Sequence, residues 1–275
     1  MESIDRPPVV SGMFYSKDPK QLKADLTTLF NSAKRIKPRN LAVVSPHAGY
    51  AYSGITAAKS IASLKPAKSF ILIGPNHQAS GIEFGIMRKG TWSTPLGKCE
   101  IDTALASKIK RRFLKEDPRT HLMEHSLEVQ LPFLQYRFEK FKFVPISITN
   151  INYTDEFLGR CEKIAESVFK AVRSRAGKGS VGIIASSDFS HYIPANLAEH
   201  IDKEAMKFIT KLDTVGLFEF LKKKRASVCG YGPIAVVMSV AQKLGLKSKV
   251  ISYSHSGQST GDLSSVVGYA AIGFG

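Results

Sequence analysis

Short apolar runs that alternate with amphipathic stretches are the feature that most constrains the fold of this chain. Runs rich in β-branched residues cover four ranges: 41–45, 69–74, 143–148 and 181–185. They do not alternate polar with apolar residues, which is typical of strands buried on both faces of a sheet. Helical periodicity lies between and after them, and we predict helices over these ranges: 53–64, 103–115, 124–138, 155–175, 195–212 and 234–244. This alternation predicts an α/β fold with a largely parallel central sheet flanked by helices.

Two stretches break the alternation and indicate that the sheet is mixed. Residues 82–101 and 249–274 contain short strand patterns joined by glycine, which predict antiparallel pairs. No repeat or Pro/Ser-rich linker interrupts the 275 residues, so we expect one domain over residues 1–275. No apolar run approaches the ~18 residues of a membrane span, and the N-terminus lacks the apolar core of a signal peptide. We therefore expect a cytoplasmic protein that does not enter a membrane.

The charge balance bears on the kind of partner. The chain has 39 Lys and Arg against 23 Asp and Glu, a formal net charge of +16. This excess attracts polyanions in general. The basic residues form scattered clusters without interleaved aromatic residues, and no nucleic-acid-binding module accompanies them. Solvated helix faces are therefore favoured over a nucleic-acid groove.

Polar residues follow three of the predicted strands directly. His47 comes after the first strand, His77 after the second, and Asp188 and His191 after the strand at 181–185. Ligands of open α/β sheets bind outside the carboxyl ends of the strands, so these side chains could converge on one site. The alternative is that each histidine forms hydrogen bonds only within its own loop.

Cys229 directly precedes the predicted helix at 234–244, in the sequence C-G-Y-G-P. The helix dipole and the free amides there would lower the pKa of the thiol and favour thiolate, the form that binds metals. The alternative is a small buried hydrophobic residue, the role that we predict for Cys99 and Cys161. Three widely spaced cysteines with no C-x-x-C indicate neither a disulfide framework nor a zinc ribbon.

A fourth group is spaced i, i+3, i+4 and i+7: His121, Glu124, His125 and Glu128. On a helix these four would share one face, which could be a metal-binding face or a solvated polar face.

Residues 257–261 match the G-x-S-x-G pattern of hydrolases, but no helix pattern and no histidine follow them. We predict a hairpin turn there.

Five motifs in this order resemble those of the Memo family, over residues 6–274. They are S-P-H-A-G-Y at 45–50, G-P-N-H at 74–77, E-H-S-L-E at 124–128, S-S-D-F-S-H at 186–191 and C-G-Y-G-P at 229–233. The resemblance implies a fold shared with class III extradiol dioxygenases. Those enzymes hold a mononuclear non-haem iron through two histidines and a glutamate.

The resemblance also implies roles for individual residues. His47 and His77 match the two histidine ligands, and Cys229 stands where the dioxygenases have their glutamate. His191 resembles their acid/base histidine, and Asp188 accompanies it. A thiolate in place of a carboxylate shifts metal preference towards Cu(I), Zn or thiolate-ligated iron.

We therefore expect a mononuclear transition metal, with iron first and copper or zinc as alternatives. The leading hypothesis is a dioxygenase-like oxidoreductase acting on a small oxidisable or carbonyl-bearing substrate, with Glu124 and His125 lining the substrate pocket. A non-catalytic metal- or peptide-binding adaptor is the alternative. The expected partner is a small-molecule or peptide ligand, nucleic acid is disfavoured, and a homo-oligomer is compatible with the sequence.

Overall fold

A large mixed sheet organises the protein, which the computed structural model describes over residues 4–109, 112–149, 153–175 and 181–275. The strands are β1 (Asp5–Arg6), β2 (Ala42–Ser45), β3 (Ser69–Pro75), β4 (Phe84–Ile86), β5 (Thr91–Thr94), β6 (Gly97–Ile101), β7 (Lys115–Glu116), β8 (Lys142–Ile148), β9 (Val181–Ser186), β10 (His191–Ile193), β11 (Ser248–His255) and β12 (Val266–Phe274). Their main order is β1-β5-β6-β8-β3-β9-β2-β12-β10; β11 pairs with β12, and β4 pairs with β7 and β8.

The centre of the sheet is parallel, and most of the pairs outside it are antiparallel, although β1 at one border pairs in parallel with β5. Strand β3 pairs in parallel with β8 and β9, and β2 pairs in parallel with β9. The pairs β11 with β12, β12 with β2, and β5 with β6 are antiparallel. All residues of β2, β3 and β9 are buried, as expected for strands covered on both faces. The predicted single α/β domain with a mixed, largely parallel sheet is confirmed.

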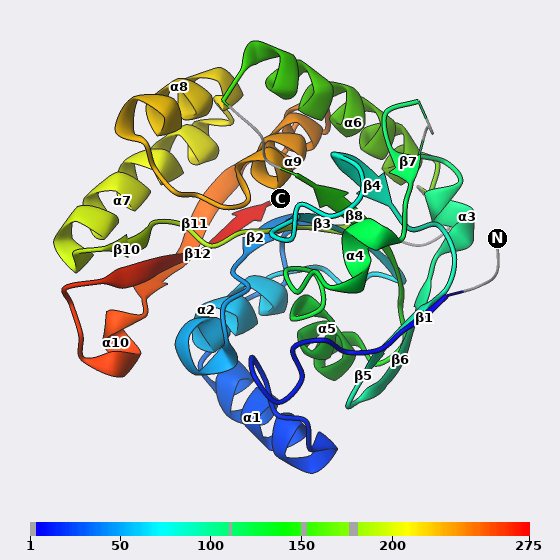
Figure 1. Ribbon diagram of the computed structural model, residues 1–275, viewed down its shortest axis with the longest axis horizontal. Helices are drawn as coiled ribbons and strands as arrows, with labels where there is room; N and C mark the ends of the chain where they lie inside the picture. The colour runs from blue at the N-terminus through cyan, green and yellow to red at the C-terminus, as the bar shows by residue number, and fades with distance from the viewer. Residues whose placement is uncertain (1–3, 110–111, 150–152, 176–180) are drawn as a thin grey trace.

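Helices pack on both faces of this sheet (Figure 1). They are α1 (Pro19–Asn31), α2 (Tyr50–Ala62), α3 (Thr103–Ala106), α4 (Arg119–Leu122), α5 (Gln130–Phe138), α6 (Asp155–Arg173), α7 (Ala195–Lys211), α8 (Thr214–Lys224), α9 (Tyr231–Lys243) and α10 (Gly257–Thr260). The predictions at 53–64, 155–175, 195–212 and 234–244 are confirmed to within a few residues by α2, α6, α7 and α9. None of these helices is long and apolar enough to cross a membrane, over the ranges described above.

Alternate residues of the central strands belong to two separate apolar cores. Ile71 and Ile183 pack in the core that contains residues of α6 and α9. Phe70 and Ile184 pack in the core that contains residues of α1 and α2. The side-chain alternation of a strand explains this division. The sheet is therefore held rigidly between two layers of helices, which fixes the positions of the loops that follow its strands.

Two predicted helices were too long. Helix α3 ends at Ala106 and α5 begins at Gln130, whereas the sequence pattern predicts helices over 103–115 and 124–138; residues 110–111 lie outside the described ranges. The buried guanidinium of Arg88 donates to the carbonyls of Ala106, Ile109 and Leu114. Because these carbonyls accept hydrogen bonds from a side chain, the stretch does not continue as a helix.

The segment at 257–261 connects β11 to β12, as a hairpin connection does, but most of it is the short helix α10. The prediction of a simple hairpin turn was therefore wrong in its local geometry. Gly261 closes this helix with φ +80°, a left-handed conformation that glycine adopts at no steric cost.

Candidate metal centre

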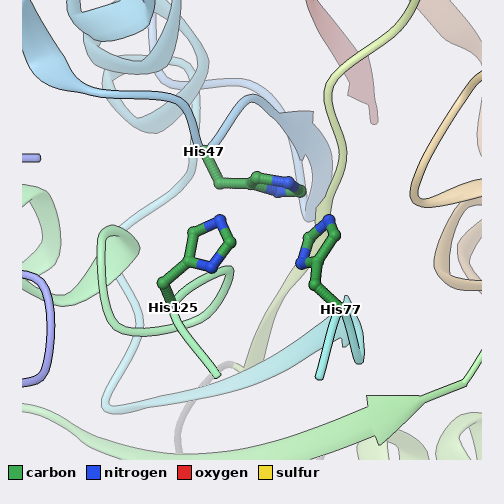
Figure 2. A group of neighbouring side chains, drawn as sticks. All are labelled: His47, His77 and His125. Atoms are coloured by element: carbon green, nitrogen blue, oxygen red, sulfur yellow. The ribbon is translucent and has the colours of Figure 1, made fainter. Parts of the chain in front are cut away.

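Three imidazoles converge beyond the carboxyl ends of the central strands. His47 follows β2, His77 follows β3, and His125 lies in the segment between α4 and α5. One ring nitrogen of each lies within 4.8 Å of the corresponding nitrogen of the other two. Figure 2 shows the three rings facing a common space. This spacing is compatible with one metal ion bound by all three.

Hydrogen bonds fix the tautomer of His47. Its Nδ1 lies 2.9 Å from Ser186 Oγ, and that hydroxyl donates its one proton to the carbonyl of Ser126 at 2.7 Å. Ser186 Oγ therefore accepts, both from His47 Nδ1 and from the Gln130 amide at 3.0 Å. The Nε2 lone pair of His47 is left to bind a ligand. Burial lowers the pKa of His47 well below its ordinary value, and the nearby histidines lower it further, so the ring is neutral.

The carboxylate of Glu124 fixes His77 in the same way. Glu124 accepts from His77 Nδ1 at 2.9 Å and also from the His77 backbone amide. Burial alone would raise the pKa of Glu124, but the hydrogen bond and charge of His77 outweigh it and lower this pKa to about 2. Burial alone would lower the pKa of His77, and Glu124 reverses that effect. An ionised carboxylate on Nδ1 leaves Nε2 as the outward nitrogen, the usual arrangement behind a metal-binding histidine.

His125 completes the group and lies on its accessible side. Its ring stacks on that of His77 with centroids 4.8 Å apart and an angle of 22° between the planes, and it contacts Phe14 on another side. The side chains of His77 and His125 are 31% and 18% exposed, whereas that of His47 is 2% exposed. An ion or substrate would therefore reach the group past His77 and His125.

Cys229 and Asp188 lie beside Nε2 of His47, the nitrogen that is left to bind a ligand. Cys229 Sγ is 3.3 Å from His47 Nε2, and Asp188 Oδ1 accepts from the His47 amide at 2.8 Å. Burial raises the pKa of Asp188 to about 6. Burial, reinforced by the charge of Asp188, raises the pKa of the Cys229 thiol well above its ordinary value. The prediction that the start of α9 favours thiolate at Cys229 is thus wrong for the metal-free protein, because desolvation outweighs the helix dipole.

His191 lies at the edge of this group, at the start of β10. Its charge lowers the pKa of both His47 and Asp188. His191 Nδ1 is 2.7 Å from the carbonyl oxygen of Ser227, which only accepts, so Nδ1 donates. The backbone amide of His191 donates to the hydroxyl of the same serine at 2.8 Å. The ring is therefore held in one orientation with Nε2 unprotonated when the imidazole is neutral.

The other two members of the predicted four-residue face point elsewhere. His121 and Glu128 are fully buried, and Glu128 pairs with the buried Arg6 at 2.7 Å. Arg6 also donates to the carbonyls of His121 and Glu124, both at 2.7 Å. These bonds occupy carbonyls that a continuous helix would need, so the segment forms α4 followed by turns. The four residues therefore share neither a metal-binding face nor a solvated face: His125 belongs to the candidate metal group and Glu124 holds His77, whereas His121 and Glu128 are buried apart from it.

Two glycines allow the loops around the site to approach one another. A Cβ on Gly74, in β3, would lie 2.6 Å from Leu127 Cδ2 and 2.7 Å from Ser126 Oγ. A Cβ on Gly230, beside Cys229, would lie 2.4 Å from the carbonyl oxygen of Ser186. Any larger residue would separate the 124–128 segment from β3, or Cys229 from β9.

Comparison with known proteins decides the family. The family model described as "Memo-like protein" matches residues 6–273. The chain belongs to the Memo family. This Memo-family chain is 43% identical over 272 residues to a MEMO1 family protein of Methanosarcina barkeri, covering 97% of this chain and 98% of the relative. It is 39% identical over 287 residues to a MEMO1 family protein of Saccharolobus solfataricus, covering 98% and 99% of the two chains.

A solved structure supports the fold of this Memo-family chain. The crystal structure of the uncharacterized protein JW3007 from Escherichia coli K12 matches with a TM-score of 0.50 at 11% sequence identity, covering 85% of this chain and 99% of that one. At this identity the match concerns the fold alone.

The structure brings most of the predicted site residues together. His47, His77, Cys229, Asp188, Glu124 and His125 all lie in or directly against the group, and His191 lies at its edge. The roles predicted for Cys229 as a ligand and for His191 and Asp188 in catalysis stay predictions. Sequence reasoning assigned His125 to the pocket wall or to a separate four-residue metal-binding face, and did not group it with His47 and His77. Its position directly after Glu124, the partner of His77, was the available signal.

Proposed function

We propose that this protein binds one transition-metal ion through His47, His77 and His125. The observation that supports this most is the fixed protonation of two of the rings, since Nδ1 of both His47 and His77 is held by an acceptor. Because these hydrogen bonds already fix the orientation of the rings and leave Nε2 free, metal binding requires no further ordering of the two side chains. Imidazole nitrogen suits iron, copper and zinc alike. We propose iron, which the resemblance to extradiol dioxygenases implies, with copper or zinc as alternatives.

We further propose that the bound ion serves an oxidoreductase acting on a small oxidisable or carbonyl-bearing substrate. The ion would act as a Lewis acid on a substrate oxygen. Substrate would enter past His77 and His125, the exposed members of the group. His191 would accept and return a proton at Nε2, because Ser227 occupies Nδ1. Asp188 would keep His47 in place through the backbone amide.

Metal analysis of protein purified without chelator tests the first proposal. We expect about one metal per chain, and a raised melting temperature on adding the ion to metal-free protein. His47→Ala, His77→Ala and His125→Ala should each lose the ion. The control is His200→Ala, which removes an exposed histidine from α7 and should retain it. Absence of metal in wild type, with no thermal shift on adding iron, copper or zinc, would contradict the proposal.

Two further variants define the neighbours of the ion. Glu124→Gln keeps the shape but weakens the hold on His77, so we expect metal affinity to fall by about 10–100-fold. Cys229→Ser should lower affinity sharply if the thiol is a fourth ligand. Unchanged affinity in Cys229→Ser would remove Cys229 from the ligand set and leave the three histidines.

Oxygen consumption tests the enzymatic part. Iron-loaded protein, prepared anaerobically, would be incubated with a panel of catechols and with a cell extract. We expect consumption that His191→Ala lowers by about 10²–10⁴-fold while the metal content stays at wild-type level. No consumption by the wild type across the panel and the extract would contradict the enzyme and leave a metal-binding protein without turnover.

A further inference from the structure

A hollow lies at the ends of the central strands opposite to the three histidines. It has a volume of about 930 Å³ and is bordered by α1, the β5–β6 turn, the end of α5 and the starts of β3 and β8. Lys68 directly precedes β3 and Lys142 begins β8, whereas His77 follows the other end of β3. A seven-residue strand spans roughly 20 Å, so a ligand in this hollow is remote from the three histidines.

Lysine dominates the walls of the hollow. Five lysines face two acidic residues: Lys23, Lys68, Lys98, Lys140 and Lys142 against Glu100 and Glu139. Lys142 pairs with Glu100 at 2.7 Å, and Lys98 pairs with Asp5 outside the hollow. The walls therefore hold more positive charge than their own carboxylates can balance.

Three of these lysines are not engaged in ion pairs. Lys23, Lys68 and Lys140 are exposed, and none has an acidic partner within 4.0 Å among the residues that the structure describes. They come from three separate elements, α1, the loop before β3 and the loop before β8, which the fold brings to one hollow. Like charges held around one concave space repel one another, and a multiply charged anion would offset that repulsion.

Part of the lining of the hollow is apolar. Leu96 and Phe141 are half-buried and Cys99 is buried, and all three line it. The Tyr136 ring stacks on Phe30 with centroids 5.0 Å apart, which holds it at the wall. A lining that combines charged groups with apolar side chains is typical of sites that take an organic molecule rather than a bare ion.

We infer that this hollow binds a small organic polyphosphate of about the size of a nucleoside triphosphate. Three unpaired ammonium groups suit a ligand with two or more phosphates, and the apolar lining residues suit its organic part. The volume is within the ~300–1,000 Å³ of small-molecule sites. The lining also contains the carboxylates of Glu100 and Glu139, so the lysines do not form an unbroken positive surface. This disfavours a long nucleic-acid backbone, which needs a continuous basic track.

Calorimetric titration of the metal-free protein with ATP in EDTA tests this inference without involving the histidine site. We expect saturable one-to-one binding of ATP, measurable binding of inorganic tripolyphosphate, and at least tenfold weaker binding of adenosine. The triple variant Lys23→Ala/Lys68→Ala/Lys140→Ala should bind ATP at least tenfold more weakly than wild type.

The matched control is Lys222→Ala/Lys223→Ala/Lys224→Ala, which removes the same charge from the exposed end of α8. It should keep wild-type affinity, and circular dichroism would establish that both triple variants are folded. Equal losses in the two triple variants would overturn the inference, because diffuse charge would then explain binding. Adenosine binding as tightly as ATP, no ATP binding at all, or binding of poly(U) without binding of ATP would overturn it as well.

Discussion

Replacing Arg6 should destabilise the protein far more than its place near the N-terminus suggests. Its guanidinium is fully buried, donates to three carbonyls and to Glu128, and lies 4.2 Å from the centre of the Trp92 ring. Arg6→Met keeps much of the volume and removes every one of these polar contacts. Glu128 would then lie buried with its negative charge unbalanced, although Tyr15 and two backbone amides still donate to it.

The size of the effect follows from this geometry. Removing one member of a buried ion pair costs about 3–5 kcal/mol, chiefly through the charge left behind. The contact with Trp92 adds about 0.5–2 kcal/mol. The remaining bonds to Glu128 offset part of the loss, so we expect about 4 kcal/mol for Arg6→Met. Arg6→Lys keeps the charge without the planar fork and should cost less.

Urea unfolding followed by fluorescence measures this directly, since Trp92 is the single tryptophan and lies beneath Arg6. Arg6→Met, Glu128→Gln and the double variant form a cycle in which the double variant should lose at least ~2 kcal/mol less than the sum. Asp5→Asn, which removes a neighbouring exposed carboxylate, should leave the midpoint unchanged. A cost below ~1 kcal/mol for Arg6→Met, or additive losses in the cycle, would refute the reasoning.

Three other results are expected. Burial lowers the pKa of His121 from 6.5 to about 3. As pH falls, His121 therefore takes up its proton in the unfolded chain before it does so in the folded protein. The free energy of unfolding should consequently fall by about 1.4 kcal/mol per pH unit between pH 6 and pH 4. His121→Leu should remove this part of the slope, and an unchanged slope would contradict it. Gly230→Ala should destabilise the protein by about 1–3 kcal/mol, because the added Cβ would collide with Ser186. The control is Gly159→Ala in α6, where an added Cβ has no neighbour within 4 Å, and it should be neutral or stabilising. Equal effects of the two substitutions in urea unfolding would contradict the close approach at Gly230. At pH 8 the native metal-free protein should react slowly with a thiol reagent at Cys229, because burial raises the pKa of this thiol. Rapid labelling of Cys229, detected by mass spectrometry, would contradict this.

The central strands and the long helices could be predicted from the sequence because burial determines both patterns. Strands covered on both faces have no polar alternation, and the 19-residue α6 has a clear apolar stripe and a Thr154 cap. Histidines at strand ends were equally predictable, because the ends of parallel strands meet at one edge. The sequence therefore indicated where a site would lie and most of the side chains around it.

The failures share a physical cause in buried arginines. Arg6 binds the carbonyls of His121 and Glu124, and Arg88 binds those of Ala106 and Ile109, in the two stretches where a predicted helix was too long. The partners in these four bonds are between 18 and 118 residues apart in the chain. No local pattern reveals such a bond. The prediction for Cys229 failed for a similar reason, since burial depends on the whole fold.

The strand order has a consequence for the biosynthesis of the protein. His47, His77 and His125 all lie in the first half of the chain, but β2 is inserted between β9 and β12, and β3 between β8 and β9. During translation the three histidines leave the ribosome long before the strands that hold them in register. Contacts of such long sequence separation form slowly. A nascent chain therefore presents its imidazoles separately, and the proposed metal site can form only once β9 and β12 have been made.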